Sequence, residues 1–508
     1  MTVARAWSAA LVGLEARPVV VEAALGSGLP GLSVVGLPDA AVRESRERIR
    51  SALRQIGLPL PGRNLVVNLA PADLPKSGTG FDLAVAIAIL AANGDVPTEP
   101  LAGMTLAGEL ALDGEIRPVP GVLSIAEGSR AEGRRFVVVA PENAAEAAAV
   151  PGIVALAAPH LGAVVAHVAG RELLTPHEPD PGRAEAPGDA LDLADVRGQA
   201  LARRALEIAA AGGHNLLFTG PPGSGKTMLA RRLPGILPPL STEESLETTR
   251  IWSAAGRLPA GASLLRDRPF RSPHHGASAP ALSGGGSDPR PGELSLAHHG
   301  VLFLDELPEF RRDALEALRE PLEEGVVRVT RATGSRSFPA RFLLVAAMNP
   351  CPCGYRGDAR RPCTCSERDV ARYRRKVSGP LLDRIDLHVE VPALPSSDLV
   401  SPAPPESSAT VRDRVVAARR RQAERTGDPR LTNATLSPAR LKATAAVHPE
   451  AGALLARAMD RLALSARAHH RILRVARTIA DLEGASGTAP AHVAEALRYR
   501  PVPAVSAP

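Results

Sequence analysis

The sequence has few cysteines, few aromatic residues, little lysine and no long apolar run. Its four cysteines among 508 residues are too few for a disulfide scaffold. No apolar stretch approaches the roughly 20 residues that a membrane-spanning helix needs, so we do not expect a membrane protein. Charged residues make up 22% and hydrophobic residues 45% of the chain, as in ordinary globular proteins, which excludes wholesale disorder.

Lysine occurs only at positions 76, 226, 376 and 442, so arginine supplies nearly all of the 60 basic residues. In a chain this biased toward arginine, a remaining lysine marks either chance or a position where arginine would not serve. Each of the four is therefore a candidate for a specific role.

The N-terminal segment does not resemble a secretory signal. Its apolar run from Ala6 to Leu14 is short, and Glu15 and Arg17 follow where a small-residue cleavage site would stand. We therefore expect a first β-strand there, in a cytoplasmic protein.

Two proline-rich segments without hydrophobic periodicity predict exposed linkers at residues 175–189 and 392–409. Length alone argues for about three domains. The linkers divide the chain into three segments and a tail: 1–174, 190–391, 410–500 and 501–508.

Each segment has its own predicted class. In the first, short apolar runs broken by glycine and proline alternate with helical patterns at Asp39–Ile56 and Asp82–Asn93, which predicts an α+β domain. The second alternates helices and strands, which predicts an α/β domain with a parallel sheet. The third has arginine, alanine and leucine at helical spacing and is predicted to be α-helical.

A phosphate-binding loop follows the apolar strand Asn215–Thr219 and precedes a helix. Its glycines let backbone N–H groups surround phosphates, and the helix N-terminus adds a positive dipole end. Lys226 is expected to reach the β- and γ-phosphates of ATP, and Thr227 to ligate Mg²⁺. The loop comprises Gly220, Pro221, Pro222, Gly223, Ser224, Gly225, Lys226 and Thr227.

A second apolar strand, Val301–Leu304, ends in Asp305 and Glu306, 78 residues after Thr227. Asp305 is expected to complete the Mg²⁺ shell, and Glu306 to polarise the attacking water. A further strand leads into Asn349, whose amide is expected to sense the γ-phosphate. These residues predict an ATP-hydrolysing site.

Two arginines extend this series. Arg384, between Asp383 and Asp386, is a candidate arginine finger for the nucleotide of a neighbouring subunit, the alternative being a surface ion pair. Arg474 lies on a predicted helix of the third segment, from which it could reach the phosphates, the alternative being a solvated basic face.

This order of motifs resembles the AAA+ ATPases and, within them, the magnesium-chelatase-like ComM (YifB) family. The resemblance covers nearly the whole chain. It implies a homohexameric ATP-driven motor that acts on single-stranded, double-stranded and branched DNA, in branch migration during recombination and natural transformation, with recombination proteins as further partners. It rests on GLP at 28–30, VGLPD at 35–39, VNLAPADL at 67–74, RSPHH at 271–275, PGELSLAH at 291–298 and SGPLLDRID at 378–386.

The first segment is similar to the C-terminal proteolytic domain of Lon, a ribosomal-S5-domain-2-like fold, around Gly108–Leu110 and Gly114–Gly121. Lon cuts with a Ser–Lys dyad. Here the place of the nucleophile falls near Thr79–Gly80, and no lysine follows Gly121 before residue 226, so we expect a non-proteolytic domain. For Lys76, a structural role and a DNA contact both stay open.

Residues 326–338 alternate apolar and basic side chains around Thr333–Gly334, which predicts a hairpin. By resemblance such hairpins, like the insert at 266–290, face the ring pore, where arginine can follow phosphates without reading bases. A solvated hairpin is the alternative. The candidate DNA contacts are Arg328, Arg331 and Arg336. Residues 356–376 carry eight basic and three acidic groups and are either a second DNA surface or a solvated charge run.

All four cysteines lie within 15 residues, as Cys351, Cys353, Cys363 and Cys365. Four thiolates suit a closed tetrahedral zinc site, although the C-x-C spacing is less specific than C-x-x-C. We expect structural Zn²⁺, with free thiols or a redox pair as the alternative.

Three functions compete. The leading one is an ATP-driven DNA translocase or helicase. The second is a chelatase-type motor that remodels a metal-inserting protein partner, which the shared AAA+ core supports. The third, an ATP-dependent protease, lacks the catalytic dyad.

Overall fold

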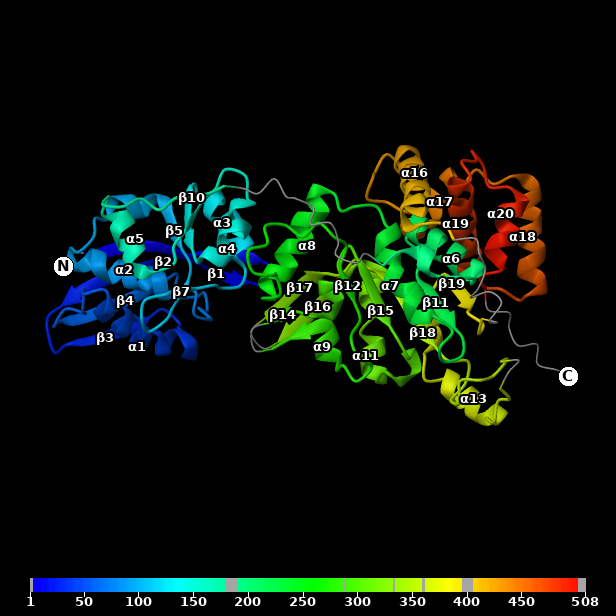
Figure 1. The fold of residues 1–508 in the computed structure, drawn as a ribbon, viewed down its shortest axis with the longest axis horizontal. Helices are drawn as coiled ribbons and strands as arrows, with labels where there is room; N and C mark the ends of the chain where they lie inside the picture. Colours follow the sequence, from blue (N-terminus) through cyan, green and yellow to red (C-terminus); the bar gives the residue numbers. More distant parts are fainter. Residues whose placement is uncertain are drawn as a thin grey trace.

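The computed structural model describes residues 3–178, 191–286, 289–331, 334–358, 361–394 and 405–500. The chain is elongated, and three parts follow one another along its length (Figure 1). We call them the N-terminal part, the central part and the C-terminal part, and they comprise residues 3–178, 191–394 and 405–500.

The N-terminal part holds two four-stranded sheets. The first runs in the order β1 (Val3–Val12), β2 (Glu15–Gly26), β4 (Asn64–Ala70) and β3 (Gly31–Val35); the second runs β10 (Pro176–His177), β9 (Val154–Ala157), β8 (Phe136–Val139) and β5 (Met104–Leu106). β6 (Glu109–Leu110) pairs with β7 (Ile116–Arg117). In β1 buried and exposed side chains alternate, because one face of its sheet covers the apolar core.

Five α-helices accompany these sheets in the described part of this region. α2 packs on β1 and β2, and nearly all of its residues are buried. Asp39 caps α1 by accepting a hydrogen bond from the Val42 N–H at 2.8 Å. The helices are α1 (Ala40–Gln55), α2 (Asp82–Asn93), α3 (Val122–Ala131), α4 (Pro141–Ala148) and α5 (Leu161–Val168).

The central part is built on a five-stranded parallel sheet. Its order is β12 (Phe270–Arg271), β15 (Val301–Leu304), β18 (Leu343–Met348), β11 (Leu216–Thr219) and β19 (Leu387–Glu390). The strands are short and strongly apolar because helices cover both faces. This arrangement is compatible with the AAA+ core that the sequence resemblance implies.

The helices of the central part and two small hairpins complete this α/β unit. β13 (Gly284–Gly285) pairs with β14 (Arg290–Pro291), and β16 (Val326–Arg331) pairs with β17 (Gly334–Pro339), both antiparallel. The helices are α6 (Ala200–Gly212), α7 (Lys226–Ile236), α8 (Thr242–Ala254), α9 (Ala279–Ser283), α10 (Glu293–Leu296), α11 (Arg312–Glu316), α12 (Arg319–Glu324), α13 (Glu367–Arg374) and α14 (Gly379–Leu382).

The C-terminal part is helical and shares one apolar core with the central sheet. Ile472 and Ile479 on one face of α19 join the cluster that contains Leu216 and Phe218 of β11. The described helices are α16 (Ser408–Thr426), α17 (Pro438–Thr444), α18 (Pro449–Arg461), α19 (Ala466–Leu482) and α20 (Pro490–Leu497).

The N-terminal part is docked on α8 of the central part. The Ser253 hydroxyl donates a hydrogen bond to Glu146, whose pKa is raised by burial, and the Gly121 N–H donates to the Ser253 carbonyl at 3.1 Å. Arg250 pairs with Glu127 at 2.7 Å. The contact is therefore specific and partly buried.

A second junction lies at the turn between β1 and β2. Leu14 packs against the apolar cluster that contains Val329 and Phe338 of the β16–β17 hairpin. A Cβ on Gly13 would lie 3.6 Å from Cδ of Arg336. The turn of the N-terminal sheet thus touches the hairpin of the central part.

The fold differs from the sequence-based expectations at three places. Pro176–His177, inside the predicted linker, forms strand β10 because its backbone pairs with β9. α16 begins at Ser408, within the second predicted linker, and Phe270–Arg271 is an edge strand of the sheet rather than part of an insert. The rest of the linkers lies largely, and the tail at 501–508 wholly, outside the described residues.

The predicted mixed α/β character, the parallel sheet and the helical C-terminal region are confirmed. Among the described residues, no helix has the length and apolar character needed to cross a bilayer.

Candidate nucleotide-binding site and metal centre

The candidate nucleotide site lies where β11, β15 and β18 end. Because these strands are parallel and adjacent, the residues that follow them meet at one edge of the sheet. The loop after β11 makes a tight turn into α7, with Gly223 and Gly225 at φ of 74° and 94°. A Cβ on Gly220 would collide with the Val391 carbonyl, so this position requires glycine.

Lys226 is buried at the start of α7. Its ammonium group donates to the carbonyls of Gly220 and Pro221 at 2.7 and 2.9 Å, and to Oδ1 of Asn349 at 3.3 Å. Burial lowers the pKa of Lys226. The structure thus brings the loop lysine and the predicted sensor amide together.

Thr227 and Asp305 are also brought together. The Thr227 hydroxyl donates to Oδ2 of Asp305 at 2.7 Å, and the Glu306 N–H donates to Oδ1 at 2.9 Å. Hydroxyl and carboxylate oxygens are ligands that Mg²⁺ accepts. The Ser224 hydroxyl is buried in the loop and has no hydrogen-bond partner among the described residues, as expected of a group that faces a bound phosphate. The oxygen atoms of Thr227, Asp305 and Ser224 therefore suit the binding of a Mg²⁺–nucleotide.

A cavity of about 140 Å³ adjoins this loop. Val196, Met228 and Leu229 give it apolar walls, and Ser224 and Gly225 connect it to the phosphate loop. Gln199 closes it by donating to the carbonyls of Ser224 and Pro392. Sequence reasoning missed this cavity, because its walls come from 195–199, 224–229 and Leu394, which share no motif.

Glu306 has a partner that sequence reasoning also missed. Oε2 of Glu306 lies 3.2 Å from Nδ1 of His275, in the loop after β12. The His275 ring packs on His274 and meets Phe310 edge-on. Glu306 itself has a φ of 53°, a left-handed conformation that is uncommon for a non-glycine residue. The carboxylate is thus held by the loop of the neighbouring strand.

The hydrogen bonds of Arg384 do not reach the phosphate loop of its own chain. Its guanidinium pairs with Glu323 of α12 and donates to the carbonyl of Pro380. Arg471, which the sequence did not single out, pairs with Asp383 at 3.1 Å and so joins α19 to this segment.

Arg474 points into the C-terminal part. It donates to the carbonyl of Leu436, and burial lowers its pKa. This hydrogen bond does not bring Arg474 to the phosphate loop, where the sequence predicted it.

The three candidate arginines of the β16–β17 hairpin differ in their surroundings. Arg328 pairs with Glu324 at 2.7 Å and with Glu320, so its charge is largely balanced. Arg331 is exposed and lies beside Gly285 of the β13–β14 hairpin. Arg336 lies beside Gly13. Thr333 of the predicted hairpin turn lies outside the described residues.

The four cysteines converge as predicted. The Sγ atom of Cys351 lies 3.4 Å from that of Cys353 and 3.6 Å from that of Cys363, and all four Sγ atoms lie within 4.8 Å of one another. A tetrahedron with Zn–S bonds of about 2.3 Å has sulfur–sulfur edges of about 3.8 Å. Backbone N–H groups of Tyr355 and Thr364 lower the pKa of Cys353 to about 5. The thiols therefore fit a tetrahedral divalent metal.

A second cluster of metal-ligating side chains, Glu247, His298 and His299, does not fit a metal as well. Nδ1 of His298 accepts a hydrogen bond from the Arg341 N–H at 3.0 Å. A neutral imidazole with an accepting Nδ1 carries its proton on Nε2, the atom that faces Glu247 at 3.1 Å. His298 is therefore a hydrogen-bond donor to Glu247.

Lys76 is completely buried, and its ammonium group donates to the Pro71 carbonyl. This burial favours the structural role of Lys76 over a DNA contact. A Cβ on Gly80, near the expected place of a Lon-like nucleophile, would lie 3.8 Å from Cγ1 of Val119. The atoms nearest to that position belong to the aliphatic side chain of Val119.

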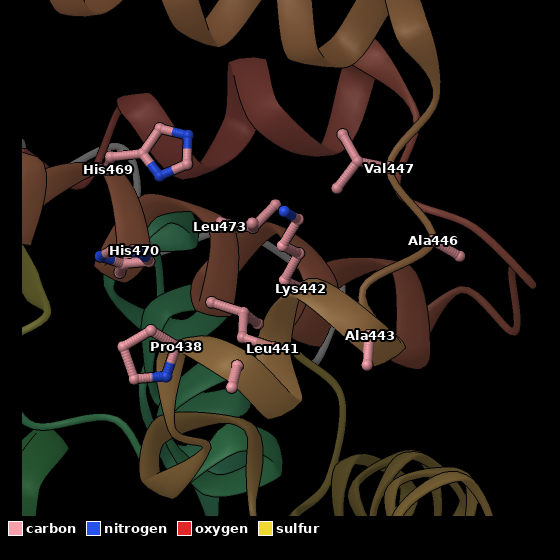
Figure 2. Close-up of a pocket in the computed structure, with 10 residues that line it drawn as sticks. Pro438, Leu441, Lys442, Ala443, Ala446, Val447, His469, His470 and Leu473 are labelled. Atoms are coloured by element: carbon pink, nitrogen blue, oxygen red, sulfur yellow. The ribbon is translucent and has the colours of Figure 1, made fainter.

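A further cavity of about 620 Å³ opens between α17 and α19 (Figure 2). Its walls are mainly aliphatic, with Lys442, His469 and His470 as the polar members. None of the predicted site residues lines it.

Sequence profiles of magnesium chelatase match most of the chain. The profile for subunit ChlI of Mg-chelatase matches residues 21–143, that for magnesium chelatase, subunit ChlI, matches 192–399, and that for the ChlI C-terminal region matches 405–500.

The chain is also similar along its whole length to three curated bacterial proteins. It is 45% identical over 504 residues to the uncharacterized protein YifB of Salmonella typhimurium, which covers 99% of this chain and 98% of the relative. It is 46% identical over 496 residues to YifB of Escherichia coli, covering 97% and 96%. It is 45% identical over 505 residues to the competence protein ComM of Haemophilus influenzae, covering 98% of each.

Proposed function

The chain belongs to the magnesium-chelatase-like family that includes YifB and ComM, and from this premise we propose that it is an ATP-driven DNA motor. In this proposal it acts in the cytoplasm as a homohexamer on single-stranded, double-stranded and branched DNA, in recombination and natural transformation. The observation that carries the proposal is the meeting of Lys226, Thr227, Asp305 and Asn349 at one edge of a parallel sheet.

The ATPase half follows from that edge. The loop N–H groups and Lys226 would bind the phosphates, and Thr227 and Asp305 would hold Mg²⁺, which neutralises charge on the transferred phosphoryl group. Glu306 would orient the attacking water, and Asn349 would hold the γ-phosphate. The apolar cavity beside Ser224 would take the adenine base.

Hydrolysis would require two subunits. Arg384 forms an ion pair with Glu323, as the alternative reading of this arginine expected, and none of its hydrogen bonds reaches its own phosphate loop. In the proposed ring this pair would open, and Arg384 would turn to the nucleotide of the neighbouring subunit. The link from Arg471 to Asp383 would transmit movement of the C-terminal part to this segment. Arg474 remains a candidate for the same phosphates after rearrangement of that part.

The DNA half rests on the name of a relative and on the charge of the chain. The relative from Haemophilus influenzae is called a competence protein. The chain is basic, with a formal net charge of +6, and the β16–β17 hairpin presents Arg331 and Arg336 without an acidic partner among the described residues. Recombination proteins would be the partners of such a motor.

Two further assignments belong to this proposal. The cysteines would hold a structural Zn²⁺, which would clamp the loop that follows Asn349. The N-terminal part would be a Lon-like, ribosomal-S5-domain-2-like domain without protease activity, supported by the aliphatic surroundings of Gly80.

A chelatase-type motor that remodels a metal-inserting protein is the second candidate, because the three matching profiles are those of a magnesium chelatase subunit. The two candidates differ in their partner. Stimulation of the ATPase by DNA supports the first, and an ATPase that ignores every nucleic acid supports the second.

The test is the ATPase rate of the purified full-length chain with and without forked or four-way DNA, together with its oligomeric state in the presence of nucleotide. The proposal expects a ring and a rate that DNA raises several-fold. A chain that stays monomeric with nucleotide, or hydrolyses ATP equally with and without DNA, would contradict the proposal.

A further inference from the structure

The segment from Cys351 to Val377, here called the cysteine arm, follows strand β18 and the sensor residue Asn349 and includes α13. It begins two residues after Asn349, passes through all four cysteines and ends in a helix that stands away from the central sheet (Figure 1). Its residues 359–360 lie outside the described part. The arm is the most basic described segment near the nucleotide site, and the ATPase chemistry uses none of its arginines.

α13 and the three residues that follow it have two faces. Val370, Tyr373 and Val377 are buried, and Tyr373 and Val377 belong to the apolar cluster that contains Leu302 and Leu344 of the central sheet. Arg368, Arg372 and Arg375 are exposed, and at spacings of four and three residues they form one outward row. The apolar face therefore fixes the helix, and the arginine row faces away from the protein.

Most of this positive charge is not balanced within the described chain. Arg372 pairs with Asp369, and Lys376 pairs with Glu309 at 3.0 Å. Arg368, Arg374 and Arg375 have no ion-pair partner among the described residues. The acidic residues of α13, Glu367 and Asp369, lie in its first turn, so the C-terminal end is almost purely cationic.

A stacked pair extends the cationic surface toward the cysteines. The Arg361 guanidinium lies over the Tyr355 ring, 4.2 Å from its centroid, and donates to the Tyr355 hydroxyl at 2.9 Å. A guanidinium fixed in a plane presents its remaining N–H groups in a geometry that suits phosphate oxygens. This chemistry favours the sugar–phosphate backbone of a nucleic acid over an acidic protein, because the carboxylates of a protein are less regularly spaced.

The same arm touches the phosphate-binding loop. Gly354, between Cys353 and Tyr355, has a φ of 86°, and a Cβ there would lie 2.7 Å from Cδ of Pro222. On the other side, the Tyr373 hydroxyl is buried near the backbone of Asn349. The arm is thus packed against both the loop and the sensor residue of the nucleotide site.

We propose that the cysteine arm is a DNA-binding element, in which the outward arginines of α13 hold the phosphate backbone and the contact of Gly354 with Pro222 couples that binding to the nucleotide site. This inference rests on the proposed DNA motor. It adds where DNA is held outside the hairpins and how its presence reaches the ATPase.

The first experiment measures DNA affinity by fluorescence anisotropy across a salt series, with the full-length chain. The test variant combines Arg368→Ala, Arg372→Ala and Arg375→Ala. The matched control combines Arg43→Ala, Arg50→Ala and Arg54→Ala, three exposed arginines on α1. Both variants lose the same charge, and their zinc content and thermal melting report whether they fold.

The arm variant is expected to bind at least about tenfold more weakly, with the slope of log affinity against log salt reduced by about 2 to 3, and the control is expected to stay within about twofold. Equal losses in both variants, or no loss in the arm variant, would overturn the inference. A wild-type chain that binds no DNA would instead remove the proposed function itself.

The second experiment tests the coupling with Gly354→Ala, in which the new methyl group would press on Pro222. Gly357→Ala is the control, because Gly357 has a similar φ of 82° but open space around its Cβ position. Gly354→Ala is expected to keep DNA binding and to lose most of the stimulation of the ATPase by DNA. Gly357→Ala is expected to keep both. Full stimulation in Gly354→Ala, or equal loss in both variants, would overturn the coupling.

Discussion

The Thr227 hydroxyl lies 2.7 Å from Oδ2 of Asp305 and donates a hydrogen bond to it, although 78 residues separate the two in the chain. The bond connects the start of α7 to the end of β15. It places a hydroxyl and a carboxylate side by side, next to the ammonium group of Lys226. The predictions that concern hydrolysis start from this arrangement.

Replacing Lys226 by alanine is expected to weaken ATP binding by about 100-fold, because a charged hydrogen-bonding group worth roughly 3 kcal/mol is removed from the phosphates. Titration with a fluorescent ATP analogue measures this. Lys442→Ala, which changes an exposed lysine of α17, is the control. Wild-type affinity in Lys226→Ala would show that the phosphates bind elsewhere.

Replacing Glu306 by glutamine is expected to leave ATP binding within about twofold and to slow hydrolysis by at least 100-fold, since the loss of a positioned general base typically costs about 10² to 10⁴ in rate. Single-turnover hydrolysis and nucleotide titration separate the two effects. A variant that hydrolyses ATP at the normal rate would remove Glu306 from the mechanism.

Arg384→Ala is expected to be inactive as a homo-oligomer and to be rescued by mixing. In a ring assembled from Arg384→Ala and Lys226→Ala subunits, some interfaces combine an intact loop with an intact arginine. Random mixing should therefore restore activity at about one quarter of the sites. ATPase assays of each variant and of the mixture test this. Inactive mixtures that still form rings, or an active Arg384→Ala ring, would argue against action between subunits.

Freshly purified protein is expected to contain about one zinc ion per chain, since four thiolates satisfy one tetrahedral Zn²⁺. Cys351→Ser should lose the metal and lower the thermal melting temperature, and Thr364→Ser, between two of the cysteines, should retain it. Metal analysis by mass spectrometry provides the readout. Less than about half an equivalent in the wild type would reject the zinc site.

His298 is expected to make the fold sensitive to acid. Burial lowers its pKa to about 4 from an ordinary value of 6.5. The stability gained by keeping it neutral is complete above about pH 6.5 and is lost as the pH falls toward 4, by up to about 3 kcal/mol. In His298→Asn, whose amide oxygen can accept the Arg341 N–H, this part of the pH dependence should disappear from urea unfolding curves.

A control for the acid sensitivity is His448→Asn, at an exposed position. It should follow the wild-type curve between pH 6.5 and 4. If His298→Asn also follows that curve, His298 does not carry the effect.

The sequence was most informative where one short motif contains the chemistry. The loop at 220–227 and the strand that ends in Asp305 could be predicted to meet at one edge of the sheet, because each combines an apolar strand with the polar residues that follow it. The convergence of the four cysteines was predictable for a similar reason, since all of them lie within one short segment.

Contacts between distant segments were not predictable in this way. His275 and Glu306 meet only because β12 and β15 are neighbours in the sheet, and no pattern in either segment indicates the other. Arg471 of α19 pairs with Asp383, a contact that no sequence pattern indicates, because helix rotation is set by packing. The balance of Arg328 by Glu324 likewise depends on how α12 lies along the hairpin.

The turn at Gly13 and Leu14 couples movements of the N-terminal part to movements of the central part. Leu14 shares an apolar cluster with Phe338. A movement of the β16–β17 hairpin would therefore either carry the N-terminal sheets along or separate this apolar contact and expose it to water. In the proposed motor, the N-terminal sheets would therefore move together with the hairpin that is proposed to hold DNA.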